Sequence, residues 1–105
     1  MSFKKEEFVS FPHPFKRVFD AVQTTCERLG WRIEKSDERK GRVETLVGLS
    51  LLSWGEKVFI NLSRIDDRST SVHVTSEGYG SILSMFKNPM NISKFLKELE
   101  KTLSD

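Results

Sequence analysis

The sequence predicts a two-layer α+β domain in the order β-α-β-β-β-β-α, with an antiparallel sheet and both helices on one face of it. Two stretches, residues 14–29 and 88–103, repeat apolar residues at helical spacing. Five other stretches alternate apolar and polar residues as strands do. Since each helix has one apolar stripe, both are expected to cover the same face of the sheet. A chain of 105 residues is predicted to form a single domain over residues 1–105.

The first helix has a clear start and a clear end. Pro14 suits the first helical position, where a backbone N–H is not needed. Gly30 suits the position just past the end, where a positive φ is favoured, and Trp31 is then expected to pack back near Cys26. The apolar stripe of this helix consists of Phe15, Val18, Phe19, Val22, Cys26 and Leu29.

The first strand is expected over residues 3–11, ended by the stiff corner Pro12-His13-Pro14. Residues 31–47 are predicted to form a charged hairpin that turns at Lys40-Gly41, with Gly41 in a left-handed or bulge conformation. By analogy with helix-grip and TATA-binding-protein-like folds, the first strand is expected to pair with the fifth.

The second half of the chain continues the sheet and then returns to helix. The fourth strand is predicted around residues 58–63 and the fifth around 72–75, joined by a turn at 66–69. Gly78-Tyr79-Gly80 is interpreted as a flexible turn. The last helix is predicted to begin at Asn88-Pro89, a favourable cap and first-position pair.

The apolar positions of these elements are predicted to form one contiguous core. It should contain Phe15, Phe19, Val22, Cys26, Trp31, Ile33, Val58, Ile60, Val72, Val74, Phe95, Leu96 and Leu99.

The composition limits the possible partners and compartment. Seventeen basic and 15 acidic residues give a net charge of +2, so long-range attraction to nucleic acid or an anionic membrane is not required. A single cysteine fits a reducing compartment. No apolar run approaches a membrane span or a signal peptide. A cytoplasmic location is therefore expected, although a chain trimmed of a leader would look the same.

No catalytic or metal-binding group of residues is evident in the sequence. A zinc site needs three or four ligands, and His13, His73 and Cys26 lie far apart in the sequence. Most carboxylates, Glu56 among them, are interpreted as solvated surface because they alternate with basic residues or lie in turns. We therefore expect no metal, no cofactor and no enzymatic activity.

The chain resembles a family of small, uncharacterised prokaryotic domains with an LGW…SWGE pattern. The matching segments are residues 15–22, Leu29-Gly30-Trp31-Arg32-Ile33, Gly41-Arg42-Val43-Glu44, Ser50-Leu51-Leu52-Ser53-Trp54-Gly55-Glu56 and Asn91-Ile92-Ser93-Lys94-Phe95-Leu96. The resemblance covers nearly the whole chain and implies a compact α+β domain of unknown activity. It brings no catalytic residues.

One connector is unusually apolar for a surface loop. The segment 49–55 contains Leu51, Leu52 and Trp54, which either cap the end of the core or form an exposed contact patch with Tyr79 and Met85. Such a patch would serve a second copy of the chain, a protein partner or a lipid.

The function favoured by the sequence is a non-enzymatic binding or protein-interaction module, with a small apolar ligand or a partner. A ligand pocket would lie between the sheet and the last helix, reached near Trp54 and Tyr79. The alternative is single-stranded nucleic-acid binding on the open sheet face, where Phe8, Phe59 and His73 are expected. Acidic residues alternate with the basic ones there, so nucleic acid is disfavoured. An enzyme of unassigned class ranks below both.

Overall fold

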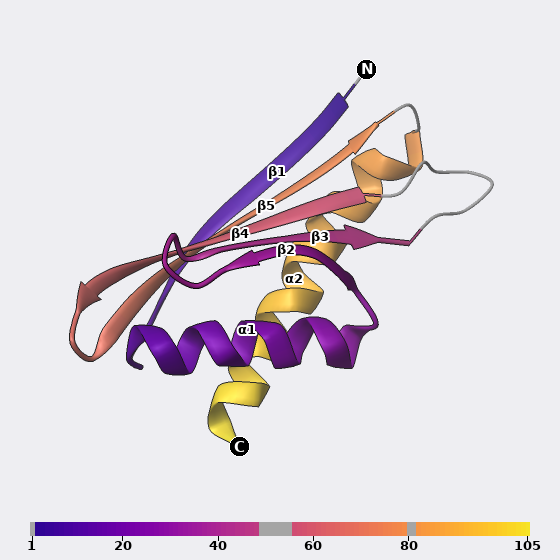
Figure 1. Cartoon of the computed structure of the whole chain (residues 1–105). Coiled ribbons are helices and arrows are strands. Elements are labelled where there is room, and N and C mark those ends of the chain that lie inside the picture. Colours follow the sequence, from indigo (N-terminus) through magenta and orange to yellow (C-terminus); the bar gives the residue numbers. More distant parts are fainter. Residues whose placement is uncertain (1, 49–55, 80–81) are drawn as a thin grey trace.

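A computed structural model describes residues 2–48, 56–79 and 82–105, with side chains for residues 4–48, 56–77 and 90–105 (Figure 1). The elements follow the predicted order. They are β1 (Ser2–Phe11), α1 (Phe15–Leu29), β2 (Arg32–Asp37), β3 (Arg42–Val47), β4 (Glu56–Asp66), β5 (Ser69–Tyr79) and α2 (Ile82–Ser104).

The strands form one antiparallel sheet in the order β1-β5-β4-β3-β2. Both helices lie on the same side of this sheet and cross each other there (Figure 1). The predicted two-layer fold class is therefore confirmed. The expected pairing of the first strand with the fifth is also confirmed, with Val9 opposite Val72.

The two central strands are longer than the sequence pattern indicated. β4 and β5 each have 11 residues. The interpretation of Gly78-Tyr79-Gly80 as a turn is wrong for its first two residues, because Gly78 pairs with Phe3 and with Glu56. Strands on both sides continue as far as Gly78, so its backbone hydrogen bonds are satisfied in the sheet despite its weak strand propensity.

The start of α2 is also corrected. The helix begins at Ile82, so Asn88 and Pro89 lie inside it. A proline inside a helix removes the hydrogen bond to the carbonyl four residues earlier and crowds that carbonyl, at a cost of roughly 3 kcal/mol. The helix nevertheless continues on both sides of Pro89. Of the helices in the described ranges, none is long and apolar enough to cross a membrane.

The end of α1 follows the predicted geometry. Gly30 has φ = 73°, its N–H donates to the Glu27 carbonyl at 3.1 Å, and the Trp31 N–H donates to the Cys26 carbonyl at 2.9 Å. This double hydrogen bond is the Schellman ending. It turns Trp31 into the core, where the indole stacks on Phe95 with ring centroids 5.6 Å apart.

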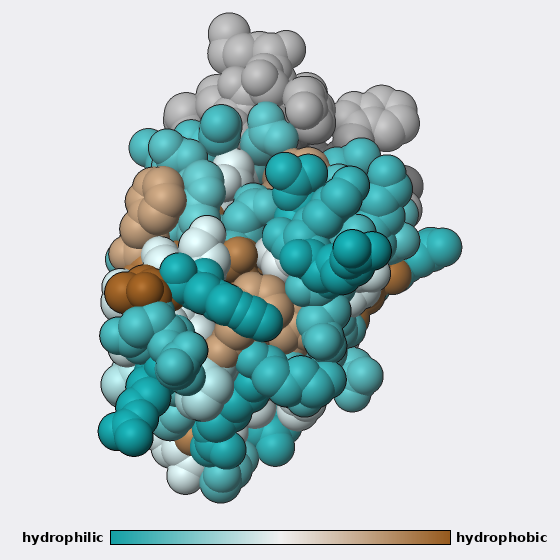
Figure 2. Space-filling view, turned by 60° about the vertical axis from the view of Figure 1, so that its left-hand side comes forward, coloured by the Kyte–Doolittle hydropathy of each residue, from teal (hydrophilic) through white to brown (hydrophobic). Residues whose placement is uncertain are grey.

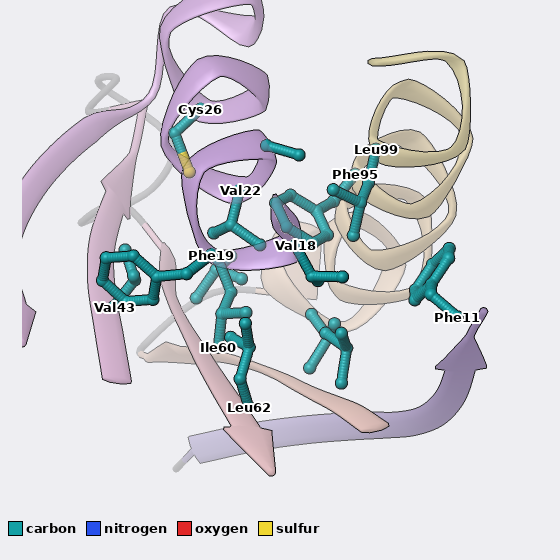
Figure 3. Packing of buried hydrophobic residues seen from close by; sticks show 14 of the residues in the cluster. Phe11, Val18, Phe19, Val22, Cys26, Val43, Ile60, Leu62, Phe95 and Leu99 are labelled. Carbon is teal, nitrogen blue, oxygen red and sulfur yellow. The ribbon is translucent and has the colours of Figure 1, made fainter. Parts of the chain in front are cut away.

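The core lies between the sheet and the two helices (Figure 3). Ten of the predicted core residues are buried, whereas Phe15, Ile33 and Leu96 are only partly buried at its edge. Phe15 and Ile33 lie near the starts of α1 and β2, whereas Leu96 lines a hollow beside β1 together with Val9 and Phe11. The core also includes Phe11, Val18, Ala21, Val43, Leu62, Ile92 and Leu103.

Polar contacts join the C-terminal end of α2 to α1. Arg17 donates to the Leu103 carbonyl at 2.8 Å, and Arg28 pairs with Asp105 at 3.2 Å. The Thr25 hydroxyl lies 3.3 Å from that of Thr102. These contacts hold one half of α2 against α1. The other half extends beyond α1 towards the end of the sheet where β3 ends and β4 begins (Figure 1).

Candidate functional site

A pocket of about 680 Å³ lies between α2 and that end of the sheet. Val47 from β3 and Glu56 from β4 line its sheet side. Its helix side is lined by Met90, Asn91, Ser93, Lys94 and Lys97. A volume of this size lies within the range of small-molecule sites in proteins.

Glu56 is the most unusual residue of this pocket. Its carboxylate belongs to a side chain that is 1% exposed, so the prediction of a solvated Glu56 is wrong. The cause is the strand period, because Glu56 stands two residues before Val58 on the apolar face of β4. Its position two residues before Val58, in step with Ile60 and Leu62, was therefore the sequence signal that could have predicted its burial.

Asn91 provides a second polar group in the pocket wall. Its side-chain nitrogen is shielded from solvent and has no hydrogen-bond partner among the described residues. The residue as a whole is half-buried, four residues before the fully buried Phe95. A buried amide donor without a partner costs free energy, and such groups are rare in native proteins.

The mouth of the pocket is apolar and basic. Met90, Lys94 and Lys97 follow one another at i, i+4 and i+7 on one stripe of α2. All three side chains are exposed, and Met90 retains 66% of its accessible surface. The lining thus combines the buried Glu56 and the half-buried Asn91 with two exposed lysines.

The patch predicted from the sequence is not tested. Leu51, Leu52 and Trp54 lie outside the described residues, and so do the side chains of Tyr79 and Met85. One of the pockets lined by described residues lies between the sheet and the last helix, the region in which a ligand pocket was expected.

The open face of the sheet carries the predicted aromatic residues among mixed charges. Phe8 is 67% exposed and stacks on His73 with ring centroids 4.0 Å apart, while Glu6 lies 3.0 Å from the His73 ring nitrogen. A shallow groove beside them contains Phe59, two basic residues and two carboxylates: Lys4, Arg42, Glu44 and Glu77. The carboxylates offset the basic side chains, so the groove has no net positive charge to attract phosphate groups and is a poor site for nucleic acid.

The surface seen in Figure 2 is mostly hydrophilic, with hydrophobic residues in small separate areas. No group of three or more His, Cys, Asp or Glu side chains suited to a metal ion occurs within the described ranges. Cys26 is fully buried in the core, and this burial raises the pKa of its thiol to about 12. The thiolate that reacts with electrophiles is therefore very scarce at neutral pH.

We predict that native Cys26 reacts slowly with an aromatic disulfide reagent and that the reaction accelerates at least about 100-fold in denaturant. Unfolding returns the thiol to its ordinary pKa and to solvent. The absorbance of the released thiolate measures both rates at pH 8. Equal rates in the two states would show that Cys26 is not on the buried face of α1.

Comparison with known proteins gives evidence on the fold. No protein-family model and no curated protein sequence matches the chain. The solved structure of Ara h 8.0201 is similar over 100% of both chains, with a TM-score of 0.69 and 12% identity. The di-domain ARO/CYC BexL from the BE-7585A biosynthetic pathway aligns over 97% of this chain and 46% of its own, with a TM-score of 0.70 and 10% identity. The Zhui aromatase/cyclase from Streptomyces sp. R1128 aligns over 99% of this chain and 87% of its own, with a TM-score of 0.60 and 9% identity.

These likenesses correct one prediction from the sequence. The chain was expected not to be an enzyme, because no catalytic group of residues was visible. Proteins with the same fold include aromatase/cyclases, which are enzymes, so that exclusion is not supported. The resemblance to the LGW…SWGE family stays a prediction. What the likenesses show is the fold, and this chain has the helix-grip fold that the sequence predicted.

Proposed function

We propose that this chain binds a small molecule with an apolar body in the pocket between α2 and the β3–β4 end of the sheet. The buried carboxylate of Glu56 in the pocket wall is the observation that carries the proposal. Glutamate is seldom fully buried, and a buried charge is costly unless other groups stabilise it. A carboxylate in a wall next to Val47 is typical of a site that needs one polar contact to orient an apolar ligand.

Glu56 is already engaged in an interaction within the protein. Because Glu56 is 1% exposed, its carboxylate lies beneath the accessible surface of the pocket, and the internal interaction holds it in the pocket wall.

The shared fold supports the same proposal. The structures similar to this chain include two that are named aromatase/cyclase or ARO/CYC, names that denote chemistry on organic molecules. A helix-grip domain can therefore hold a small organic molecule. Whether this chain also transforms its ligand is a separate question from binding. The groove on the open sheet face has no buried charged residue among the described residues that line it.

A titration with decane-1,10-diol tests the proposal. This probe is uncharged and has an apolar chain with a hydroxyl group at each end. A binding free energy of roughly 0.45 kcal/mol per non-hydrogen atom, over about 12 such atoms, corresponds to a dissociation constant on the order of 100 µM. Amide chemical shifts of isotope-labelled protein should change most around Val47, Met90 and Asn91, which line the pocket.

The variant Ser93→Trp should abolish these shift changes, because Ser93 is exposed at the pocket and an indole there would fill it. Lys101→Trp is the matched control on the same helix, since Lys101 is exposed and remote from this pocket. Shift changes that are absent, or that scatter over the surface and survive Ser93→Trp, would contradict the proposal.

A further inference from the structure

The two edges of the sheet differ in how they are protected against pairing with another strand. A free edge presents unpaired N–H and C=O groups, and proteins usually blunt it with a short strand, a bulge, a proline or charged side chains. At one edge, β2 has six residues and a register shift between Ile33 and Lys35. At the other edge, β1 has ten residues without proline and pairs with β5 in unbroken register. Of these protections, β1 has only the charged side chains.

The outer side of β1 is open along half of the strand. β1 is the outermost strand on its side of the sheet (Figure 1). Within the described ranges, its backbone makes no backbone–backbone hydrogen bond outside the ladder with β5. Lys5 and Glu7 point to the helix side, in step with the partly buried Val9, yet both are exposed. No described strand or helix therefore covers this half of the edge.

The charges of β1 allow the strand to complement itself. Two lysines, Lys4 and Lys5, precede two glutamates, Glu6 and Glu7. Of these four, only Glu6 has an ion-pair partner among the described residues, and that partner is His73. Two identical antiparallel strands are related by a two-fold axis at one residue position, because opposite side chains lie on the same face of a sheet. Only an axis at Lys5 or at Glu6 places lysines opposite glutamates.

We propose that β1 pairs antiparallel with β1 of a second copy of this chain, which joins the two five-stranded sheets into one continuous sheet. The favoured register has Glu6 on the axis, because it pairs residues 2–10 of each copy, against residues 2–8 with Lys5 on the axis. Lys5 of each copy then lies opposite Glu7 of the other. A two-fold interface contains each contact twice, so the dimer has two Lys5–Glu7 pairs.

Contacts on the open face of the sheet support this register. Lys4 of one copy lies opposite Phe8 of the other, so that the lysine side chain can cover a ring that is 67% exposed in the single chain. The two Glu6 carboxylates face each other across the axis, which is unfavourable. Lys4 of the other copy lies diagonal to each Glu6, and His73 of its own chain lies 3.0 Å away, so both offset this repulsion.

Sedimentation velocity over a series of protein concentrations tests the proposal. A small edge-to-edge interface should give a weak dimer, with a dissociation constant on the order of 100 µM. A chain that stays monomeric at about 1 mM would overturn the proposal and leave the edge to a strand of another protein.

The variants Lys5→Glu and Glu7→Lys test the register. Each one turns both Lys5–Glu7 pairs into pairs of like charge, so each variant alone should dimerise at least about tenfold more weakly. An equimolar mixture of the two variants restores opposite charges in both pairs, and it should form heterodimers about as tightly as the unaltered chain dimerises. Both positions are exposed, so far-UV circular dichroism should show that both variants fold.

Lys40→Glu is the matched control. It makes the same change of charge as Lys5→Glu at an exposed position between β2 and β3, at the opposite side of the sheet. It should change the dissociation constant less than about twofold, because salt screens charges this far apart. A dimer that neither Lys5→Glu nor Glu7→Lys weakens, or folded variants that fail to associate when mixed, would overturn the proposed pairing.

Discussion

Replacing Phe95 by alanine is expected to lower the free energy of unfolding by about 3–5 kcal/mol. Phe95 is 0% exposed and is the largest of the fully buried side chains in the described ranges. It points from α2 into the core between α1 and the sheet (Figure 3). Its ring also stacks on that of Trp31. Alanine would leave a cavity that rigid neighbours on three elements cannot close.

Urea denaturation followed by tryptophan fluorescence measures this loss. Phe8→Ala is the matched control, since Phe8 is 67% exposed and contacts only the His73 ring among the aromatic residues described. Its loss should cost less than about 1 kcal/mol. Similar effects of the two substitutions would mean that Phe95 is not at the centre of the core.

Replacing Gly41 by alanine is expected to cost about 2–4 kcal/mol. Gly41 has φ = 66°, and a side chain in this left-handed region alone costs about 1–2 kcal/mol. An added Cβ would also lie 2.5 Å from the Leu62 carbonyl oxygen and 3.1 Å from the Phe15 ring. The Leu62 strand cannot retreat easily, because its N–H donates to the Gly41 carbonyl at 2.7 Å. The Phe15 ring is likewise held, by Arg64 at 4.3 Å from its centroid.

Gly30→Ala is the control that separates the two causes. Gly30 has nearly the same φ, 73°, but an added Cβ would meet nothing within 4 Å. This variant should lower the free energy of unfolding by only about 1–2 kcal/mol, the cost of a side chain in the left-handed backbone conformation. The free energies of unfolding obtained from denaturation curves of the two variants should therefore differ by roughly 1–2 kcal/mol, with Gly41→Ala the less stable. Equal losses would show that the crowding at Gly41 is relieved by small shifts.

The sequence alone determined the elements whose signals are local. Pro14 and Gly30 mark the ends of α1, because a fixed φ and a positive φ are properties of single residues. Pro14 is not the first helical residue as predicted: it precedes the helix with an extended ψ of 153°, and Phe15 begins α1. Alternation placed Val58, Ile60 and Leu62 on the buried face of β4, because successive side chains of a strand point to opposite faces of the sheet. The order of elements, with one apolar stripe per helix, was then enough to predict a two-layer helix-grip domain.

The tertiary structure decided the features that depend on distant segments. Gly78 belongs to β5 because β1 and β4 both reach it, and no local pattern shows how far a neighbouring strand extends. The pocket is likewise formed by Val47 and Glu56 from the sheet and by Asn91 from a helix about 40 residues later in the chain. Alternation could place Glu56 on the inner face, but only the packing of α2 makes it part of the wall of a pocket. Whether a buried polar residue is a structural group or a ligand contact depends on that space, which no residue by itself encodes.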